Sequence, residues 1–151
     1  FLKSRGCQSK DWILYGESLG SGVAVNMAFE LAVEVQLGEI STPVGGLVLE
    51  APFSSLPVLA QEHYPFFPAR LIVLDHYNSE AKIPKVDTPV LIVHGKDDRV
   101  VSVEHGMKLF QASSHPKQAK WISAAGHNNL FEFGMSDLVI DFVDKYIISE
   151  R

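Results

Sequence analysis

The hydrophobic positions of this chain form short apolar runs that alternate with longer segments of helical period. Four of these runs are bounded by glycine, proline or polar residues, and the run over residues 89–94 is almost wholly apolar. Continuous apolar runs of this length are typical of parallel strands that are buried on both faces. The pattern therefore predicts strands over residues 11–15, 44–50, 89–94 and 119–123.

Segments of helical period separate the predicted strands. Apolar residues recur at helical spacing over residues 19–37, and Gly38 is a suitable stop for that helix. Shorter helices are expected over residues 102–110 and 138–148, and residues 1–6 resemble the end of another helix. Because strands and helices alternate along the chain, the predicted fold class is α/β, a parallel sheet with crossover helices.

The segment between residues 51 and 75 breaks this alternation. It holds four prolines and an aromatic group formed by Tyr64, Phe66 and Phe67. We therefore expect a loop with short helices there rather than a regular crossover. The three aromatic side chains either line a pocket for an acyl group or pack into the core, and both interpretations stay open.

The composition says more about the possible partners of the chain than about its fold. The 151 residues suit a single domain, residues 1–151, with 46% hydrophobic residues and a net charge of −5. Basic residues are scattered, which disfavours nucleic acid as a partner. The one cysteine, Cys7, excludes an internal disulfide, which fits a reducing compartment or a fold that needs no disulfide. The expected location is intracellular, either cytoplasmic or membrane-associated. No apolar run approaches the roughly 20 residues of a membrane helix, and association with a membrane surface stays open.

The candidate chemistry begins with Gly16-Glu17-Ser18-Leu19-Gly20, which stands between the first predicted strand and the first long helix. A Gly-x-Ser-x-Gly sequence in that setting predicts a tight turn that exposes the serine hydroxyl. Both glycines are expected to remove side chains that would crowd this turn. A serine that only caps the helix is the alternative, but the glycine spacing favours a nucleophile.

A serine nucleophile needs a base and a carboxylate that orients the base. Asp98 follows the third predicted strand and His127 follows the fourth. The carboxyl ends of parallel strands share one edge of a sheet, so these residues are expected near Ser18. Asp97 competes with Asp98 for the role of the carboxylate. His94 is expected to support the turn after the third strand rather than to act in catalysis.

Four segments carry a family resemblance. They are Gly-Glu-Ser-Leu-Gly-Ser-Gly, Leu-Glu-Ala-Pro-Phe-Ser-Ser-Leu, Pro-Val-Leu-Ile-Val-His-Gly-x-x-Asp-x-x-Val and Gly-His-Asn, in this order. Together they resemble the α/β-hydrolase superfamily, and within it the Bem46-like serine hydrolases, which include the ABHD17-type protein depalmitoylases. The resemblance extends over nearly all of the chain but over only the C-terminal half of the family's fold. We therefore expect an N-terminally incomplete domain whose first strand is an exposed edge, open to self-association.

The resemblance implies a function and roles for particular residues. Ser18 would attack an acyl carbonyl, His127 would take and return the proton, and Asp98 would orient the imidazole. The backbone N–H of Leu19 would be one oxyanion donor, whereas the family's second donor comes from an earlier loop that has no matching segment here. The implied activity is cleavage of an ester or thioester of a small-molecule or acylated substrate through an acyl-enzyme, without a metal or an organic cofactor.

Three other functions are open. The first is a non-catalytic fragment that keeps these residues, and the second is an acyltransferase that uses them. The third is a peptidase, because prolyl-oligopeptidase-type enzymes share similar C-terminal motifs. A metal site made from the two histidines and two aspartates of the later loops is disfavoured, because their spacing is not that of paired ligands. The glycines of residues 16–22 match neither a P-loop nor a dinucleotide-binding loop.

Overall fold

The structure, a computed structural model, describes residues 8–40, 42–66, 68, 77–114 and 116–149. Two sequence-based predictions, the helix end over residues 1–6 and the role of Phe67, lie outside the described residues.

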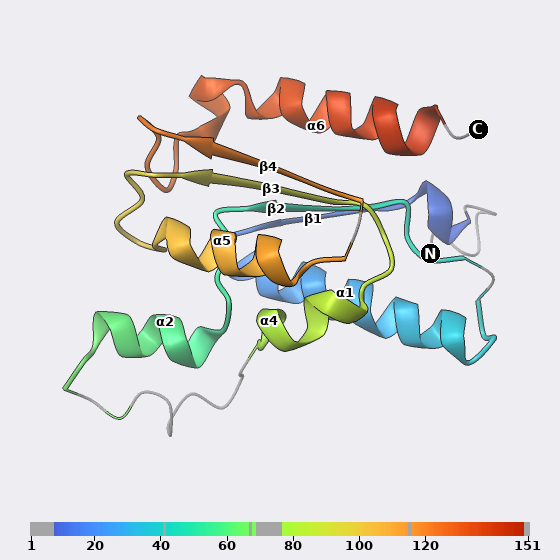
Figure 1. Ribbon diagram of the computed structural model, residues 1–151, viewed down its shortest axis with the longest axis horizontal. Helices are drawn as coiled ribbons and strands as arrows, with labels where there is room; N and C mark the ends of the chain where they lie inside the picture. Colours follow the sequence, from blue (N-terminus) through green and yellow to red (C-terminus); the bar gives the residue numbers. More distant parts are fainter. Residues whose placement is uncertain (1–7, 41, 67, 69–76, 115, 150–151) are drawn as a thin grey trace.

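Four parallel strands form one sheet, and their order in space follows their order in the chain (Figure 1). The strands are β1 (Ile13–Glu17), β2 (Gly46–Glu50), β3 (Val90–Gly95) and β4 (Lys117–Ile122). Each neighbouring pair is parallel, so every connection must cross over the sheet. The predicted α/β class and the four predicted strands are confirmed.

Helices cover both faces of the sheet (Figure 1). One face is covered by α1 (Leu19–Gln36), by α4 (Ser79–Lys82) with the 3₁₀ turn η3 (Ile83–Lys85), and by α5 (Val103–Ala112). The other face is covered by α6 (Met135–Val143), which follows the 3₁₀ turn η4 (Leu130–Phe133). A further 3₁₀ turn, η2 (Ser9–Asp11), precedes β1. Within the described ranges, no helix is long and apolar enough to cross a membrane.

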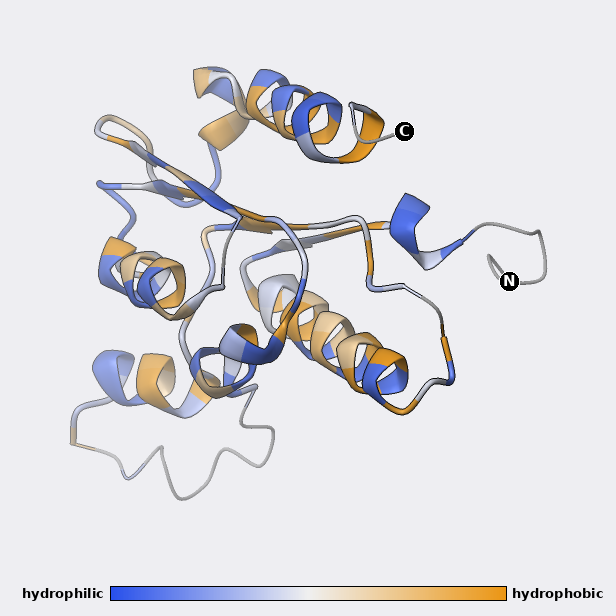
Figure 2. Ribbon diagram, turned by 45° about the vertical axis from the view of Figure 1, so that its right-hand side comes forward, coloured by the Kyte–Doolittle hydropathy of each residue, from blue (hydrophilic) through white to orange (hydrophobic). Residues whose placement is uncertain are grey.

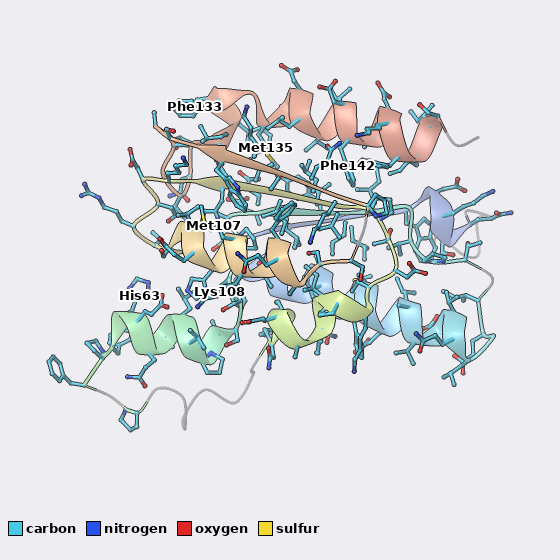
Figure 3. All side chains as sticks on the ribbon, in the orientation of Figure 1. His63, Met107, Lys108, Phe133, Met135 and Phe142 are labelled. Carbon is cyan, nitrogen blue, oxygen red and sulfur yellow. The ribbon has the colours of Figure 1, made fainter. Side chains whose placement is uncertain are left out.

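Alternate side chains of the central strands fill two separate cores. On one face Leu47, Leu49, Val90 and Ile92 pack with side chains of α1 and α5. On the other face Val48, Leu91 and Val93 pack with Met135 and Phe142, which point from α6 toward the sheet (Figure 3). Because β2 and β3 are buried on both faces, their sequences are continuous apolar runs rather than alternating ones.

The closing helix begins earlier than the sequence predicted. It starts at Met135 rather than at residue 138, because Gly134 adopts a left-handed conformation (φ 82°) that ends η4 and redirects the chain. The helix then continues beyond α6 as one π-helical turn, η5 (Asp144–Ile148). In the irregular segment after residue 51, the structure describes one short helix, α2 (Leu56–His63).

Within the described part of the chain, β1 is an edge strand that pairs with β2 alone. Ile13 and Tyr15 of this strand are 36% and 42% exposed, and Val23 and Met27 of the adjacent α1 are 44% and 46% exposed. Helix α1 is apolar along most of its length (Figure 2). An exposed apolar surface therefore runs along β1 and α1.

Candidate active site

Ser18 lies on a strained turn between β1 and α1. Its backbone has φ 48° and ψ −118°, a conformation that costs a non-glycine residue about 1–3 kcal/mol. Two hydrogen bonds hold the turn: the Ser18 N–H donates to the Glu50 carbonyl over 2.9 Å, and the Ser21 hydroxyl donates to the Ser18 carbonyl over 2.6 Å. The Ser18 hydroxyl makes no capping hydrogen bond to α1, which argues against the interpretation as a helix cap.

The two glycines of the Gly-x-Ser-x-Gly sequence differ in their surroundings. A Cβ atom added to Gly16 would lie 2.5 Å from the Gly20 carbonyl oxygen and 2.7 Å from the Ser21 Cα, both of them backbone atoms. A Cβ atom added to Gly20 would meet nothing within 4 Å among the described residues outside its chain neighbours and the adjacent backbone of α1. The close contacts therefore support this expectation for Gly16, whereas no segment outside the adjacent backbone of α1 lies close enough to require a glycine at residue 20.

This difference predicts opposite effects of alanine at the two positions. Gly16→Ala is expected to lower the free energy of unfolding by about 1–3 kcal/mol, because the end of β1 and the start of α1 would have to separate. Gly20→Ala is expected to be neutral or to stabilise by up to about 1 kcal/mol, because alanine favours a helix more than glycine does. Urea unfolding measures both values, and equal stabilities of the two variants would contradict the close contact at Gly16.

His127 brings the three predicted catalytic residues together. Its Nε2 lies 2.9 Å from the Ser18 Oγ, and its Nδ1 lies 2.7 Å from the Asp98 Oδ2. The three residues follow the ends of β1, β3 and β4. The His127 loop is closed by a hydrogen bond of 2.8 Å from the Gly126 N–H to the Asn129 Oδ1. The His127 side chain is 11% exposed, so the imidazole is largely shielded but remains within reach of solvent.

Asp98 accepts hydrogen bonds through both carboxylate oxygens. Its Oδ1 accepts the backbone N–H groups of Val100 and Val101, each over 2.8 Å. Burial acts to raise the pKa of this carboxyl, but hydrogen bonds from His94, from His127 and from the two backbone groups outweigh burial. Together they hold the pKa of Asp98 well below its ordinary range, so the group is ionised at neutral pH.

The lowered pKa of Asp98 predicts a loss of stability in acid. Because the folded-state pKa lies below the ordinary value of about 3.9, the unfolded chain binds this proton more readily. The contribution of Asp98 is fully present above that value and is lost as the pH falls through it toward the folded-state pKa. Urea unfolding at a series of pH values checks this: Asp98→Asn, which does not titrate, is expected to flatten the acid limb of the stability curve. An equally steep limb in that variant would contradict it.

The hydrogen-bond pattern determines which nitrogen of His127 carries the proton. The ionised Asp98 only accepts, so Nδ1 carries the proton that it donates to Oδ2. Nε2 then has a lone pair that accepts the Ser18 hydroxyl. The arrangement is that of a general base beside an alcohol, oriented by a carboxylate.

The other predicted site residues have different surroundings. Leu19 is the first residue of α1, so its N–H is one of those without an acceptor inside the helix. Asp97 is exposed, unlike Asp98. Tyr64 and Phe66 are 66% and 101% exposed, and their role in a substrate pocket stays a prediction. Among the residues that the structure describes, no group of three or more His, Cys, Asp or Glu is placed to hold a metal ion.

The sequence analysis did not identify Glu50, a carboxylate at the end of β2 that is 2% exposed. Its Oε2 accepts the hydroxyl of Tyr15. Burial and the charge of Glu17 raise the pKa of Glu50, whereas the Tyr15 hydrogen bond and the charge of His127 lower it, and the net shift is upward. The sequence does contain a signal for Glu50, because a charged residue stands at the end of an otherwise apolar strand.

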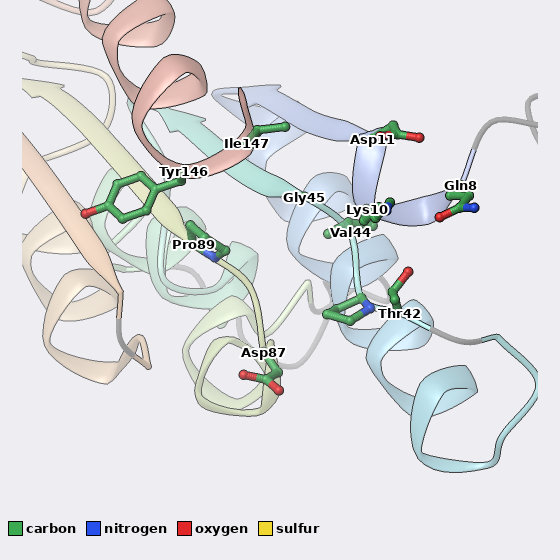
Figure 4. A pocket seen from close by; sticks show the side chains of 11 residues that line it. Gln8, Lys10, Asp11, Thr42, Val44, Gly45, Asp87, Pro89, Tyr146 and Ile147 are labelled. Atoms are coloured by element: carbon green, nitrogen blue, oxygen red, sulfur yellow. The ribbon is translucent and has the colours of Figure 1, made fainter. Parts of the chain in front are cut away.

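Two pockets of the structure lie beside the strands. One, of about 660 Å³, opens at the amino ends of the strands, between Lys10, Asp87 and Tyr146 (Figure 4). Another, of about 540 Å³, lies along the outer edge of β1 and α1 and includes Tyr15. Neither pocket has Ser18 or His127 among its lining residues.

Comparisons with known proteins add the family context. A family model described as serine aminopeptidase, S33, matches residues 77–133. An uncharacterized protein of Mycobacterium tuberculosis is 36% identical over 115 residues, which cover 76% of this chain and 37% of that protein. Human alpha/beta hydrolase domain-containing protein 17B is 30% identical over 138 residues, which cover 88% of this chain and 41% of that protein. The chain thus spans about two fifths of the length of these curated relatives.

A solved structure shows the same fold. Acetyl xylan esterase 1 from Thermoanaerobacterium superposes with a TM-score of 0.68 at 18% identity, over 93% of this chain and 47% of the esterase chain. At this identity the similarity concerns the arrangement of strands and helices alone.

Proposed function

We propose that this chain, which belongs to the α/β-hydrolase superfamily, carries the catalytic residues of a serine hydrolase that cleaves an ester or thioester through an acyl-enzyme. Its family supports hydrolase activity in general, and the fold that it shares with acetyl xylan esterase 1 agrees with that family. The observation that carries the finer proposal is the pair of contacts of His127, 2.9 Å to the Ser18 Oγ and 2.7 Å to the Asp98 Oδ2.

In the proposed mechanism, the Ser18 Oγ attacks the acyl carbon while the His127 Nε2 takes the hydroxyl proton. The Leu19 N–H donates to the developing oxyanion, and Asp98 stabilises the imidazolium. The tetrahedral intermediate then collapses: its bond to the alcohol or thiol breaks, and His127 gives its proton to that leaving group. A water molecule, deprotonated by the same imidazole, next attacks the Ser18 ester. The bond between the acyl carbon and the Ser18 Oγ then breaks, His127 returns its proton to the Oγ, and the acid is released.

A fluorophosphonate probe tests the nucleophile directly. The folded protein is expected to give a covalent adduct at Ser18, located by peptide mass spectrometry, because the imidazole activates this one hydroxyl. The urea-unfolded chain is the control and is expected to give none. A folded protein that forms no adduct at Ser18 would refute the proposal.

Two related activities would use the same residues. A peptidase is favoured by the match of residues 77–133 to the serine aminopeptidase model. Relative rates on a matched ester, thioester and peptide separate peptidase from esterase activity. An acyltransferase would pass the acyl group to an acceptor other than water, and product analysis with added alcohols reveals such transfer.

A non-catalytic part of a larger assembly is the alternative from a different class. The edge position of β1 and the apolar groove beside it favour this alternative. It predicts self-association through the unpaired edge, which sedimentation would detect as a mass that rises with concentration. A monomeric protein that hydrolyses esters would exclude it.

A further inference from the structure

His94 lies behind the Asp98 carboxylate, at the end of β3. Its side chain is fully buried, and its Nε2 lies 2.9 Å from the Val101 carbonyl oxygen and 3.3 Å from the Asp98 Oδ2. The Val101 N–H in turn donates to the Asp98 Oδ1 over 2.8 Å. The imidazole therefore contacts both the backbone at the end of the Asp98 loop and the functional carboxylate itself.

The partners of His94 select its protonation state. A carbonyl oxygen only accepts, so Nε2 must carry a proton, which it directs at both the Val101 carbonyl and the Asp98 carboxylate. Nδ1 is buried and has no hydrogen-bond partner. A second proton there would be a buried donor without an acceptor, which is costly. The geometry therefore selects the neutral imidazole with its proton on Nε2.

The position of this ring depends on Gly106 of α5. A Cβ atom at residue 106 would lie 2.6 Å from the His94 Nδ1 and 3.1 Å from the ring of Trp121. Because glycine leaves that space free, the His94 ring can stand between α5 and the Asp98 loop. Any larger side chain at residue 106 must displace the ring.

We propose that His94 is a positioning residue, which sets the orientation and the basicity of Asp98 through its Nε2 proton. This inference rests on the proposed function, because Asp98 is the carboxylate that orients His127 there. The Asp98 Oδ2 faces His127 on one side at 2.7 Å and His94 on the other at 3.3 Å. Without the His94 donor the carboxylate is more basic and holds the proton of a charged His127 more strongly. The Asp98 carboxylate also loses one of the contacts that fix the rotation of its side chain.

Three variants of the full chain separate this role from simple packing. His94→Leu removes the donor, whereas His94→Gln keeps an amide N–H near the place of Nε2. His105→Leu is the matched control, because this buried histidine contacts Ser54 and Glu62 rather than Asp98. The first readout is the NMR titration of the His127 imidazole in isotopically labelled protein, which requires no turnover. The second is the pH profile of kcat and KM on an ester.

In His94→Leu, the titration midpoint of His127 is expected to rise by about one pH unit. The value of kcat is expected to fall about tenfold, with KM nearly unchanged. His94→Gln is expected to restore both, and His105→Leu is expected to lose stability alone. An unchanged midpoint in folded His94→Leu, or a His94→Gln as impaired as His94→Leu, would overturn the proposal.

Two further comparisons keep the test decisive. If His94→Leu does not fold, Gly106→Ala displaces the ring without removing it and is expected to raise the midpoint in the same direction; no shift there overturns the proposal. Failure of the proposed function would look different, because Ser18→Ala would then keep wild-type activity. The midpoint of His127 would still report the contact between His94 and Asp98.

Discussion

Ser18→Ala is expected to lower kcat/KM for an ester substrate by about 10⁴–10⁶-fold. Among the described residues, the Ser18 Oγ is the hydroxyl that the His127 Nε2 contacts, so the variant leaves the base without a nucleophile to activate. Because the Ser18 hydroxyl does not cap α1, the variant is expected to stay folded. Initial rates on an activated ester, with circular dichroism as a check on folding, measure the loss.

A second serine provides the control for this prediction. The hydroxyl of Ser114 donates to the Pro84 carbonyl over 2.9 Å and is not among the partners of His127. Ser114→Ala is therefore expected to keep the wild-type rate. If Ser18→Ala kept more than about a tenth of that rate, the hydroxyl would contribute less than about 1.4 kcal/mol to the barrier, and it would not be the nucleophile.

Asp98→Asn is expected to lower kcat/KM by about 10⁴-fold although the side chain keeps its shape. The Oδ1 site receives two backbone N–H groups, so the amide oxygen of asparagine must occupy it. The amide nitrogen then points a donor at the Nδ1 of His127. To accept that donor, His127 must move its own proton to Nε2, where it can no longer take the proton of Ser18.

The neighbouring aspartate tests this explanation. Asp97 is exposed, and the hydrogen bonds of the His127 ring go to Ser18 and Asp98 instead, so Asp97→Asn is expected to leave kcat/KM within about twofold of wild type. Rates of the two variants across a pH series would distinguish them. If both variants lost a similar part of kcat/KM, Asp97 would again be a candidate for the carboxylate that orients His127.

The sequence predicted best where burial determines the pattern. Strands β2 and β3 have apolar neighbours on both faces, so their apolar runs indicate buried strands directly. The family resemblance carried by the four segments is confirmed by human alpha/beta hydrolase domain-containing protein 17B, which matches most of the chain. The roles of Ser18, Asp98 and His127 stay predictions, and the structure brings their side chains within hydrogen-bonding distance.

Features that depend on contacts between distant segments could not be predicted in this way. The contact of His94 with Asp98 depends on how the loop after β3 folds back, and no spacing signals it. The open space at Gly20 depends on what faces the start of α1. The early start of α6 depends on the left-handed backbone of Gly134, which the helical period alone did not locate.

The wide separation of Ser18 and His127 along the chain has a practical consequence. The two residues are 109 positions apart, so the serine becomes reactive only in molecules whose first and last strands are both in place. Labelling of Ser18 by a probe would then count native molecules individually, much as an active-site titrant does. A substitution that unfolds only the C-terminal elements would abolish the labelling of Ser18, whereas the ellipticity of the remaining helices would hardly change.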